Sequence, residues 1–407
     1  MELSNGTRFF LAGAALVALA ACGGGGTTPN GAAPNAILRQ AQDDTRQAQD
    51  DTRQGDNGAA KALDSKSVLK KLTKDVTIGS TVDPTNGDTN PHAISVVPTS
   101  YGKLKKNQIL VCNYANASGN PGTGTTIEEF NPAASSTPTR YVQSTKIAGC
   151  DGDALTSANQ TYATGEGSKL MAWITQKAAV KKTYGNPITE PIADADAPAL
   201  ALYSPEYIFI GNGDTGAVDN IGLGSYGNGK PLEVIAGFDV GTGSNGQLLG
   251  PSGLAYWCGV HPGALKCKGK VLNRDTLYVA DGACNTIVAI SNASSLLVTD
   301  EITVQPGCQS FSCKYPSTTC GTVVKTGSPL SAPVAETLLP NGNLVVANSG
   351  DNNLVELTPS GKVLATKAID SGESPGVSAV FAIGSTDKNT AIYYTDTNTN
   401  TLHELER

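Results

Sequence analysis

Short apolar runs recur in pairs along the chain, and a polar turn separates the two runs of each pair. Within Asn341–Leu357, the run Leu344–Val346 leads through Asn-Ser-Gly-Asp-Asn-Asn to the alternating run Leu354–Leu357. β-Branched residues, alternation and turn chemistry of this kind are typical of a β-hairpin. Three further pairs follow the same plan: Ile109–Asn113 with Thr125–Phe130, Leu277–Asp281 with Asn285–Ile290, and Ile392–Asp396 with Asn400–Leu405.

The hairpins are parts of a longer repeat. In three of the four, four positions separate the Asp or Asn that ends the first strand from the Asn that opens the second, and fixed spacing indicates a repeat architecture. An apolar strand with a nearby proline precedes each hairpin, and a further strand closes most copies. The preceding strands are Pro91–Val97, Pro251–Tyr256, Ala332–Leu338 and Ser374–Val380; the closing ones include Leu232–Ala236 and Lys362–Thr366. Weaker copies place Ala197–Leu202 before Tyr207–Ile210, and Asn159–Thr164 before Leu170–Thr175.

Six copies of about four strands predict an all-β fold, a six-bladed β-propeller spanning residues 66–407. A seventh blade is the alternative, because the pattern is weakest between residues 131 and 200. The last copy ends at Arg407 after its third strand, so we expect its fourth strand to come from Ser67–Thr77. Such closure removes open sheet edges.

The repeat motif resembles that of NHL-repeat propellers over roughly residues 90–407. The resemblance rests on Pro-x-x-apolar, then G-N-L-V-V-A-N or T-L-Y-V-A-D, then N-x-[I/L]-V-x-[I/L]. An Arg often found in that family's last strand is missing, since Val288, Val355 and His403 occupy its place. The resemblance therefore implies the fold and not a ligand.

The N-terminus predicts export and lipid anchoring. Arg8 precedes the apolar run Phe9–Ala21, which is typical of a signal peptide over residues 1–21 and too short for a stable membrane span. Cys22 follows Leu-Ala-Ala, which resembles the lipobox of bacterial lipoproteins. This implies a lipidated Cys22 and a location in the bacterial cell envelope, periplasmic or at the cell surface. An ordinary signal peptide with an incidental cysteine is the alternative.

Residues 22–65 read as the lipid anchor and a disordered linker. The segment is rich in Gly, Thr, Pro and Asn, and then repeats the heptad R-Q-A-Q-D-D-T. Because the heptad carries no large apolar residue, it offers no coiled-coil seam. We expect a spacer that holds the folded part away from the membrane.

Charge and composition limit the kinds of partner that the chain is expected to bind. The net charge of −7 argues against nucleic acid, and the low aromatic content of 5% argues against a stacking platform for bases or sugars. We expect a monomer that touches the membrane only through its anchor and binds an envelope protein or a small molecule.

The remaining eight cysteines predict disulfides, because an exported protein is oxidised. Propeller topology favours Cys112 with Cys150 and Cys284 with Cys308. The same topology favours Cys258 with Cys267, which flank one loop, and Cys313 with Cys320, which share an insertion. A metal site at Cys308, Cys313 and Cys320 is the alternative, but no CxxC pair or nearby His supports it.

Polar residues gather on the predicted hairpin face of the propeller. The candidate ligand or funnel residues are His92, Asn113, Asn212, Asp214, Asp281, Asn348, Asp351 and Asp396. Oxygen ligands of this kind hold Ca²⁺, although Asp and Asn at strand ends also stabilise turns through their own backbone. Turn chemistry is the favoured interpretation, and no cofactor is expected beyond the calcium alternative.

Candidate catalytic groups are few. Six-bladed lactonases of the gluconolactonase type place oxygen ligands where each inner strand begins, but this chain has His92, Ser252, Ala332 and Ser374 there. A lyase would need a His as acid or base, and of His92, His261 and His403 only His92 lies near the expected funnel. The sequence therefore favours a binding or scaffold module, with a metal-dependent hydrolase or lyase as the alternative.

Overall fold

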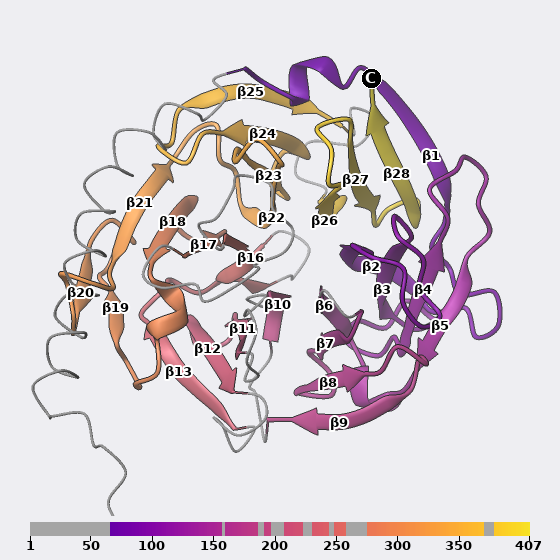
Figure 1. Cartoon of the computed structure of the whole chain (residues 1–407), viewed down its shortest axis with the longest axis horizontal. Helices are drawn as coiled ribbons and strands as arrows, with labels where there is room; N and C mark the ends of the chain where they lie inside the picture. Colours follow the sequence, from indigo (N-terminus) through magenta and orange to yellow (C-terminus); the bar gives the residue numbers. More distant parts are fainter. Residues whose placement is uncertain are drawn as a thin grey trace, which may run out of the picture. The chain divides into compact units, whose positions relative to one another are not determined.

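Six sheets of four or more strands stand around one axis in the computed structural model of the chain (Figure 1). The structure describes residues 66–156, 159–185, 191–196, 207–222, 230–243, 248–257, 275–369 and 378–407. The prediction of an all-β, six-bladed propeller is confirmed. Residues 131–200 supply strands of the first three blades and no seventh blade among the described residues.

The innermost strand of each blade touches the innermost strands of both neighbouring blades, so the ring is closed. In ring order these strands are β2 (Thr89–Val96), β6 (Cys150–Leu155), β10 (Pro191–Asp196), β16 (Pro251–Trp257), β22 (Pro333–Leu338) and β26 (Val380–Ser385). A Cβ atom on Gly253 would lie 2.8 Å from the Cα of Ala335. Glycine therefore lets the backbones of β16 and β22 approach each other.

Each inner strand is followed outward by antiparallel partners. The first blade adds β3 (Ile109–Ala115), β4 (Thr126–Phe130) and β5 (Thr139–Gln143), and the second adds β7 (Thr161–Gly165), β8 (Leu170–Ile174) and β9 (Val180–Tyr184). The third adds β11 (Tyr207–Asn212), β12 (Ala217–Gly222) and β13 (Pro231–Ala236), and is extended by β19 (Ile302–Val304) and β20 (Phe311–Cys313). The fourth adds β17 (Thr276–Asp281), β18 (Thr286–Ser291) and β21 (Gly321–Thr326), and the fifth adds β23 (Leu344–Asn348), β24 (Asn353–Leu357) and β25 (Val363–Ala368). The sixth adds β27 (Ala391–Asp396) and β28 (Thr401–Glu406), while β14 (Gly241–Thr242) and β15 (Leu248–Leu249) form a separate ribbon.

The continuous apolar runs of the sequence reflect burial on both faces of each blade. Successive side chains of a strand point to opposite faces. In β23, Val345 packs in a cluster with Ile392 of the sixth blade, whereas Val346 packs in a cluster with Ile287 of the fourth. Because both faces are covered, all five residues of β23 are buried.

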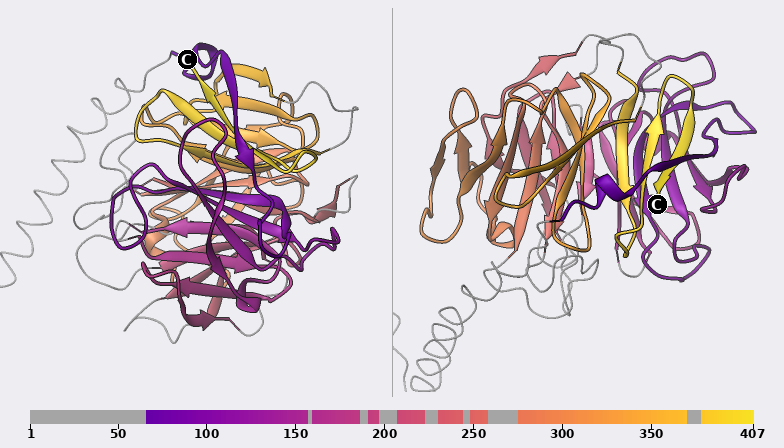
Figure 2. Two further views of the ribbon diagram at one scale, coloured as in Figure 1. Left: turned by 90° about the vertical axis from the view of Figure 1, so that its right-hand side faces the viewer. Right: turned by 90° about the horizontal axis from the view of Figure 1, so that it is seen from above.

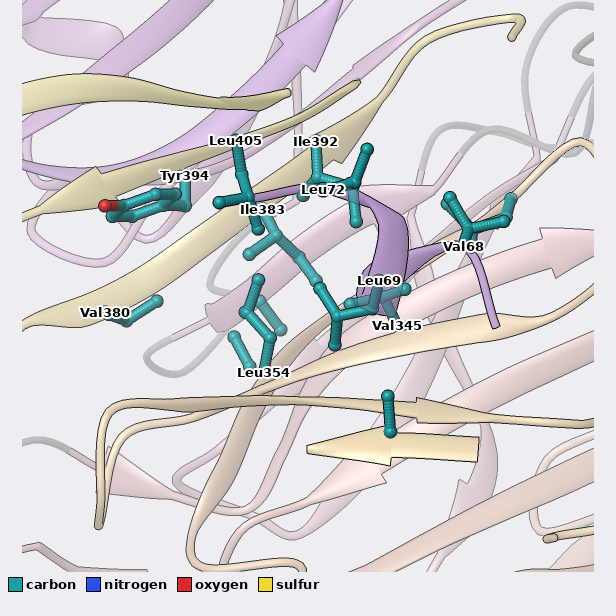
Figure 3. Close-up of a cluster of buried hydrophobic side chains, with 14 of the residues drawn as sticks. Val68, Leu69, Leu72, Val345, Leu354, Val380, Ile383, Ile392, Tyr394 and Leu405 are labelled. Carbon is teal, nitrogen blue, oxygen red and sulfur yellow. The ribbon is translucent and has the colours of Figure 1, made fainter. Parts of the chain in front are cut away.

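The predicted closure of the ring by the N-terminal segment is also confirmed. Strand β1 (Lys74–Ser80) pairs antiparallel with β28 and forms the outer edge of the sixth blade (Figure 2). The short helix η1 (Leu69–Lys71) precedes it, and Leu69 and Leu72 pack into the cluster between the fifth and sixth blades (Figure 3). The buried Glu356 carboxylate accepts hydrogen bonds from Ser67 Oγ at 2.6 Å, Val68 N at 3.0 Å and Leu69 N at 2.9 Å.

Two inner strands begin elsewhere than predicted. Asn159–Thr164 was expected to be a first strand, but β7 is the second strand of its blade and β6 lies inside it. The sequence of β6, Cys-Asp-Gly-Asp-Ala-Leu, hides its strand character because it carries two acidic residues. Strand β26 starts at Val380, after most of the predicted Ser374–Val380. The predicted Ala197–Leu202 lies outside the described residues.

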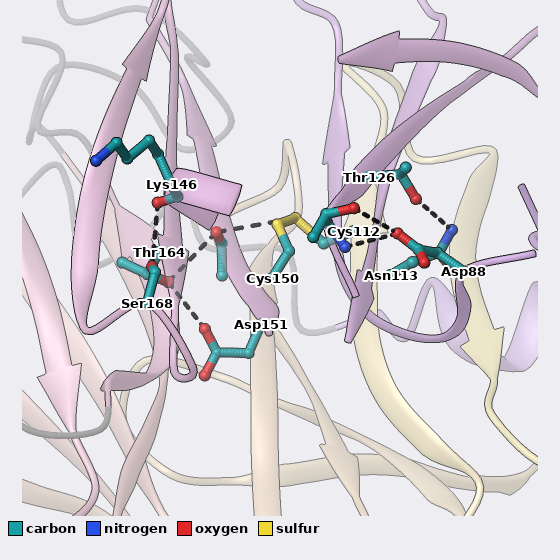
Figure 4. Close-up of a disulfide and its surroundings, with 11 residues drawn as sticks. Asp88, Cys112, Asn113, Thr126, Lys146, Cys150, Asp151, Thr164 and Ser168 are labelled. Carbon is teal, nitrogen blue, oxygen red and sulfur yellow. Dashed lines mark hydrogen bonds between the residues drawn. A yellow bond between two sulfur atoms is a disulfide. The ribbon is translucent and has the colours of Figure 1, made fainter. Parts of the chain in front are cut away.

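Three disulfides match the pairs favoured by topology. Cys112 joins Cys150, the first residue of β6 rather than part of a connection, and so ties the first blade to the second (Figure 4). Cys284 joins Cys308, and Cys313 joins Cys320. Cys308, Cys313 and Cys320, the alternative metal ligands, are therefore all in disulfides, whose sulfurs are not thiolates. Cys258 and Cys267 lie outside the described residues, as do Cys22 and the segments 1–21 and 22–65.

Candidate functional site

A cavity of about 420 Å³ opens at the end of the propeller where the inner strands begin. It draws residues from five of the six inner strands and from the turns beside them. The described residues that line it are Thr89, Asn90, His92, Tyr114, Ala115, Gly119, Pro121, Asp151, Glu166, Leu248, Ser252, Val334, Ser378, Phe381, Thr397, Asn398 and Asn400. A concave site of this size, with apolar and polar groups together, has the dimensions of a small-molecule pocket.

Three stacked rings form one wall of the cavity. The imidazole of His92 on β2 lies between the rings of Tyr114 and Phe381, with centroid distances of 4.1 Å and 4.6 Å. The interplanar angles are 7° and 3°, so the three rings are nearly parallel. Phe381 belongs to β26 in the sixth blade, and the stack therefore crosses the junction that β1 closes.

His92 is neutral at physiological pH. Burial lowers its pKa to about 3, because the rings on both faces replace water around the imidazolium. Only its edge, partly exposed, remains for a ligand. A neutral imidazole can stack and exchange hydrogen bonds, but it is a weak proton acceptor near pH 7.

Two carboxylates of the second blade also line the cavity. Glu166, in the turn between β7 and β8, accepts a hydrogen bond from the Tyr114 hydroxyl at 2.5 Å. Asp151 of β6 is 5% exposed and accepts a hydrogen bond from Thr164 Oγ1 at 3.1 Å (Figure 4). The described lining contains no lysine or arginine, so its charged groups are all acidic.

The asparagine that recurs in the hairpin turns joins neighbouring blades, and Asn400 does so at the rim of the cavity. Asn400 has a left-handed φ of 55°, and its Oδ1 accepts hydrogen bonds from Thr89 Oγ1 at 2.6 Å and Asn90 N at 2.8 Å in the next blade. The equivalent Asn285 and Asn352 have φ of 50° and 52°. Their Oδ1 atoms accept from Ala332 N and Ala379 N, at 2.6 Å and 2.9 Å. Each Asn therefore fastens its turn to the inner strand of the following blade.

Of the eight candidate residues from the sequence, His92 alone is among the described residues that line the cavity. Most of the others serve turns and strand ends. Asp281, Asp351 and Asp396 accept hydrogen bonds from amides two or three residues later in their own turns. The Nδ2 atoms of Asn113, Asn212 and Asn348 donate to Thr81 O, Asp219 Oδ2 and Pro329 O, and Asp214 is exposed in a turn. These contacts agree with the turn-chemistry interpretation.

The predicted ligand set for a metal does not assemble at the cavity in the described part of the chain. The one group of three His, Cys, Asp or Glu ligand atoms there is Asp239 with Cys284 and Cys308, and these cysteines form a disulfide. Of the four inner-strand positions compared with lactonases, His92 and Ser252 line the cavity, Ala332 does not, and Ser374 lies outside the described residues.

Of the other two histidines, His403 does not line the cavity and His261 lies outside the described residues. His403 on β28 stacks on Tyr394 at 4.8 Å, and its Nδ1 lies 3.2 Å from Asp75 Oδ1 of β1. It therefore helps to join the two chain ends.

Sequence reasoning missed Tyr114, Phe381, Asp151 and Glu166. Tyr114 directly follows a recognised strand, and its position near a funnel was a usable signal. Asp151 lay in a segment that the hydrophobic pattern did not identify as a strand. Nothing in the pattern could have brought Phe381 to His92, because their contact depends on closure of the ring.

Comparisons with known proteins found similar solved structures but no matching family model and no matching curated protein. Among solved structures, selenomethionine-substituted virginiamycin B lyase from Staphylococcus aureus has 15% identity and a TM-score of 0.48, with 82% of this chain and 98% of that chain covered. A catalytically inactive form of that lyase with quinupristin has 16% identity and a TM-score of 0.44, at the same coverage. The WD40 β-propeller domain of Doa1 has 11% identity and a TM-score of 0.44, covering 82% and 96%. Similarity at this level carries no information about activity or ligand.

The helices in the described part of the chain are short 3₁₀ turns. None of them has the length and hydrophobicity that crossing a membrane requires.

Proposed function

We propose that this chain is a binding module of the bacterial cell envelope, anchored through a lipidated Cys22, whose central cavity holds a small-molecule ligand. The observation that carries the proposal is the 420 Å³ cavity walled by the Tyr114–His92–Phe381 stack. Rigid rings and a few fixed polar groups give affinity and orientation with little loss of side-chain entropy on binding. The disulfides agree with an oxidising compartment.

The chemistry of His92 favours binding over catalysis. A general base works best when its pKa is near the operating pH, and burial holds the pKa of His92 at about 3. Both faces of its ring are covered, so it has little freedom to follow a moving proton. The metal-dependent hydrolase or lyase stays the alternative function, and no described group of ligands at the cavity supports it.

Equilibrium dialysis tests the proposal. The purified protein is dialysed against a defined mixture of amines, amino acids, sugars, nucleosides and aromatic acids, and retained compounds are identified by mass spectrometry. Asn398→Trp obstructs the cavity from an exposed turn, so the substitution leaves the core intact. Thr318→Trp, exposed in the insertion between β20 and β21, is the matched control.

We expect at least one compound to be retained by the wild type and by Thr318→Trp, and to be lost from Asn398→Trp. Retention by no form, or equal retention by all three, contradicts a ligand site at the axis. The lipid anchor is tested separately by mass spectrometry of the mature N-terminus, with Cys22→Ser as the control. Unmodified Cys22 in envelope preparations contradicts the anchoring.

A further inference from the structure

We propose that the ligand of the axial cavity is an organic cation, a protonated amine or a quaternary ammonium that carries an apolar body. This inference rests on the proposed function and names the chemical class that the cavity selects.

The charge of the wall is the first reason. Asp151 and Glu166 line the cavity from one blade, and the described lining contains no lysine or arginine. His92 adds no positive charge, because its imidazole is neutral at physiological pH. An anionic ligand would meet two like charges, whereas a cation would be attracted at short range in a partly desolvated site.

The aromatic wall is the second reason. Tyr114 and Phe381 are partly exposed at the cavity, and aromatic rings attract cations within about 6 Å through the negative potential of their faces. The Tyr114 hydroxyl donates a hydrogen bond to Glu166, so the hydroxyl oxygen can accept a hydrogen bond from a ligand. An ammonium N–H can therefore reach a carboxylate while its carbon atoms rest on a ring.

The remaining lining suits the apolar body of such a ligand. Leu248, Val334 and Pro121 supply apolar surface. Amide and hydroxyl groups from the Thr397–Asn400 turn supply hydrogen-bond partners at the rim. Both kinds of surface fit an amine with a short aliphatic or aromatic substituent.

Isothermal titration with two pairs of probes tests the inference. Each pair matches a cation with a neutral molecule of nearly the same shape: choline with 3,3-dimethylbutan-1-ol, and 2-phenylethylammonium with 2-phenylethanol. The variants are Glu166→Gln and Asp151→Asn. Asp387→Asn is the control, because it removes an equal charge at a site beyond the other end of β26. Circular dichroism and melting temperature verify the fold of every variant.

We expect at least one cation to bind about tenfold or more tightly than its neutral partner, since only the cation is attracted by the carboxylate charges in a partly desolvated site. Glu166→Gln or Asp151→Asn should weaken that cation about tenfold and leave the neutral partner unchanged. Asp387→Asn should change neither, and added salt should weaken only the cation.

The result that overturns the inference is equal binding within each pair, or no binding of either cation. Neither result decides the proposed function. If dialysis still shows that Asn398→Trp loses a neutral or anionic compound, the cavity is a binding site of different selectivity. If dialysis also shows nothing, both proposals fall together.

Discussion

Asn400 offers a direct test of how the ring is fastened at the cavity. Its side chain accepts two hydrogen bonds from the first blade, and its backbone sits at a left-handed φ of 55°. Losing two such bonds costs about 1–3 kcal/mol in the free energy of unfolding. Placing alanine at this φ adds roughly 1 kcal/mol, because alanine lacks the short polar side chain with which asparagine offsets the strain of a left-handed backbone. Asn400→Ala should therefore destabilise the protein by about 2–4 kcal/mol.

Thermal unfolding, followed by circular dichroism and calorimetry, measures the effect. At roughly 2 °C per kcal/mol for a domain of this size, the Tm of Asn400→Ala should fall by about 4–8 °C. Asn400→Asp is the matched variant, because it keeps the oxygen that accepts both hydrogen bonds and tolerates a left-handed φ. It should lose less than half as much. If Asn400→Ala melts within about 1 °C of the wild type, or if Asn400→Asp is equally destabilised, the fastening role assigned to this side chain is wrong.

Three further variants test other parts of the structure. Burial, with Asp83 nearby, raises the pKa of Glu128 to about 9. The protonated carboxyl therefore stabilises the folded state below pH 4.5, and this contribution is lost as pH rises toward 9. Between pH 6 and 9, Glu128→Gln should lose less stability than the wild type in urea titrations, and parallel pH profiles of the two proteins would contradict this. Replacing Cys284 and Cys308 with serine removes a disulfide whose cysteines are 24 positions apart. The free energy of unfolding should fall by about 3 kcal/mol in thermal unfolding, whereas an unchanged Tm would show that the disulfide does not stabilise the protein. Glu356→Ala should speed hydrogen exchange at the amides of residues 68 and 69 at least tenfold, while the core amides of β23 stay protected; unaltered exchange would mean that this carboxylate does not hold the N-terminal segment.

The fold was predictable because the middle strands of each blade are buried on both faces. Strands such as β17 and β23 carry unbroken apolar runs, and the turn residues of their hairpins recur at fixed spacing. The inner strands were harder to place, because their side chains meet the axis and its cavity. In β6 the apolar pattern is interrupted by Asp151, which lines the cavity, and by the buried Asp153.

The site was less predictable than the fold. Its aromatic wall joins residues 92, 114 and 381, which meet only when the sixth blade closes on the first. The acidic residues that stood out in the sequence belong instead to turns, where their carboxylates bind backbone amides. Local pattern identifies such turns, but it does not reveal which side chains a closed ring brings together.

The central claim is that the axial cavity around His92 holds a ligand, and the three histidines of the chain make one measurement decisive. Protein labelled with ¹⁵N-histidine is titrated with the compound that dialysis retains, and the imidazole resonances are followed. Assignments come from His92→Gln and His403→Gln. Binding at the cavity should shift the resonances of His92 progressively and saturably, while those of His403, at the outer seam with β1, stay in place. Saturable binding that leaves His92 unmoved would contradict the account.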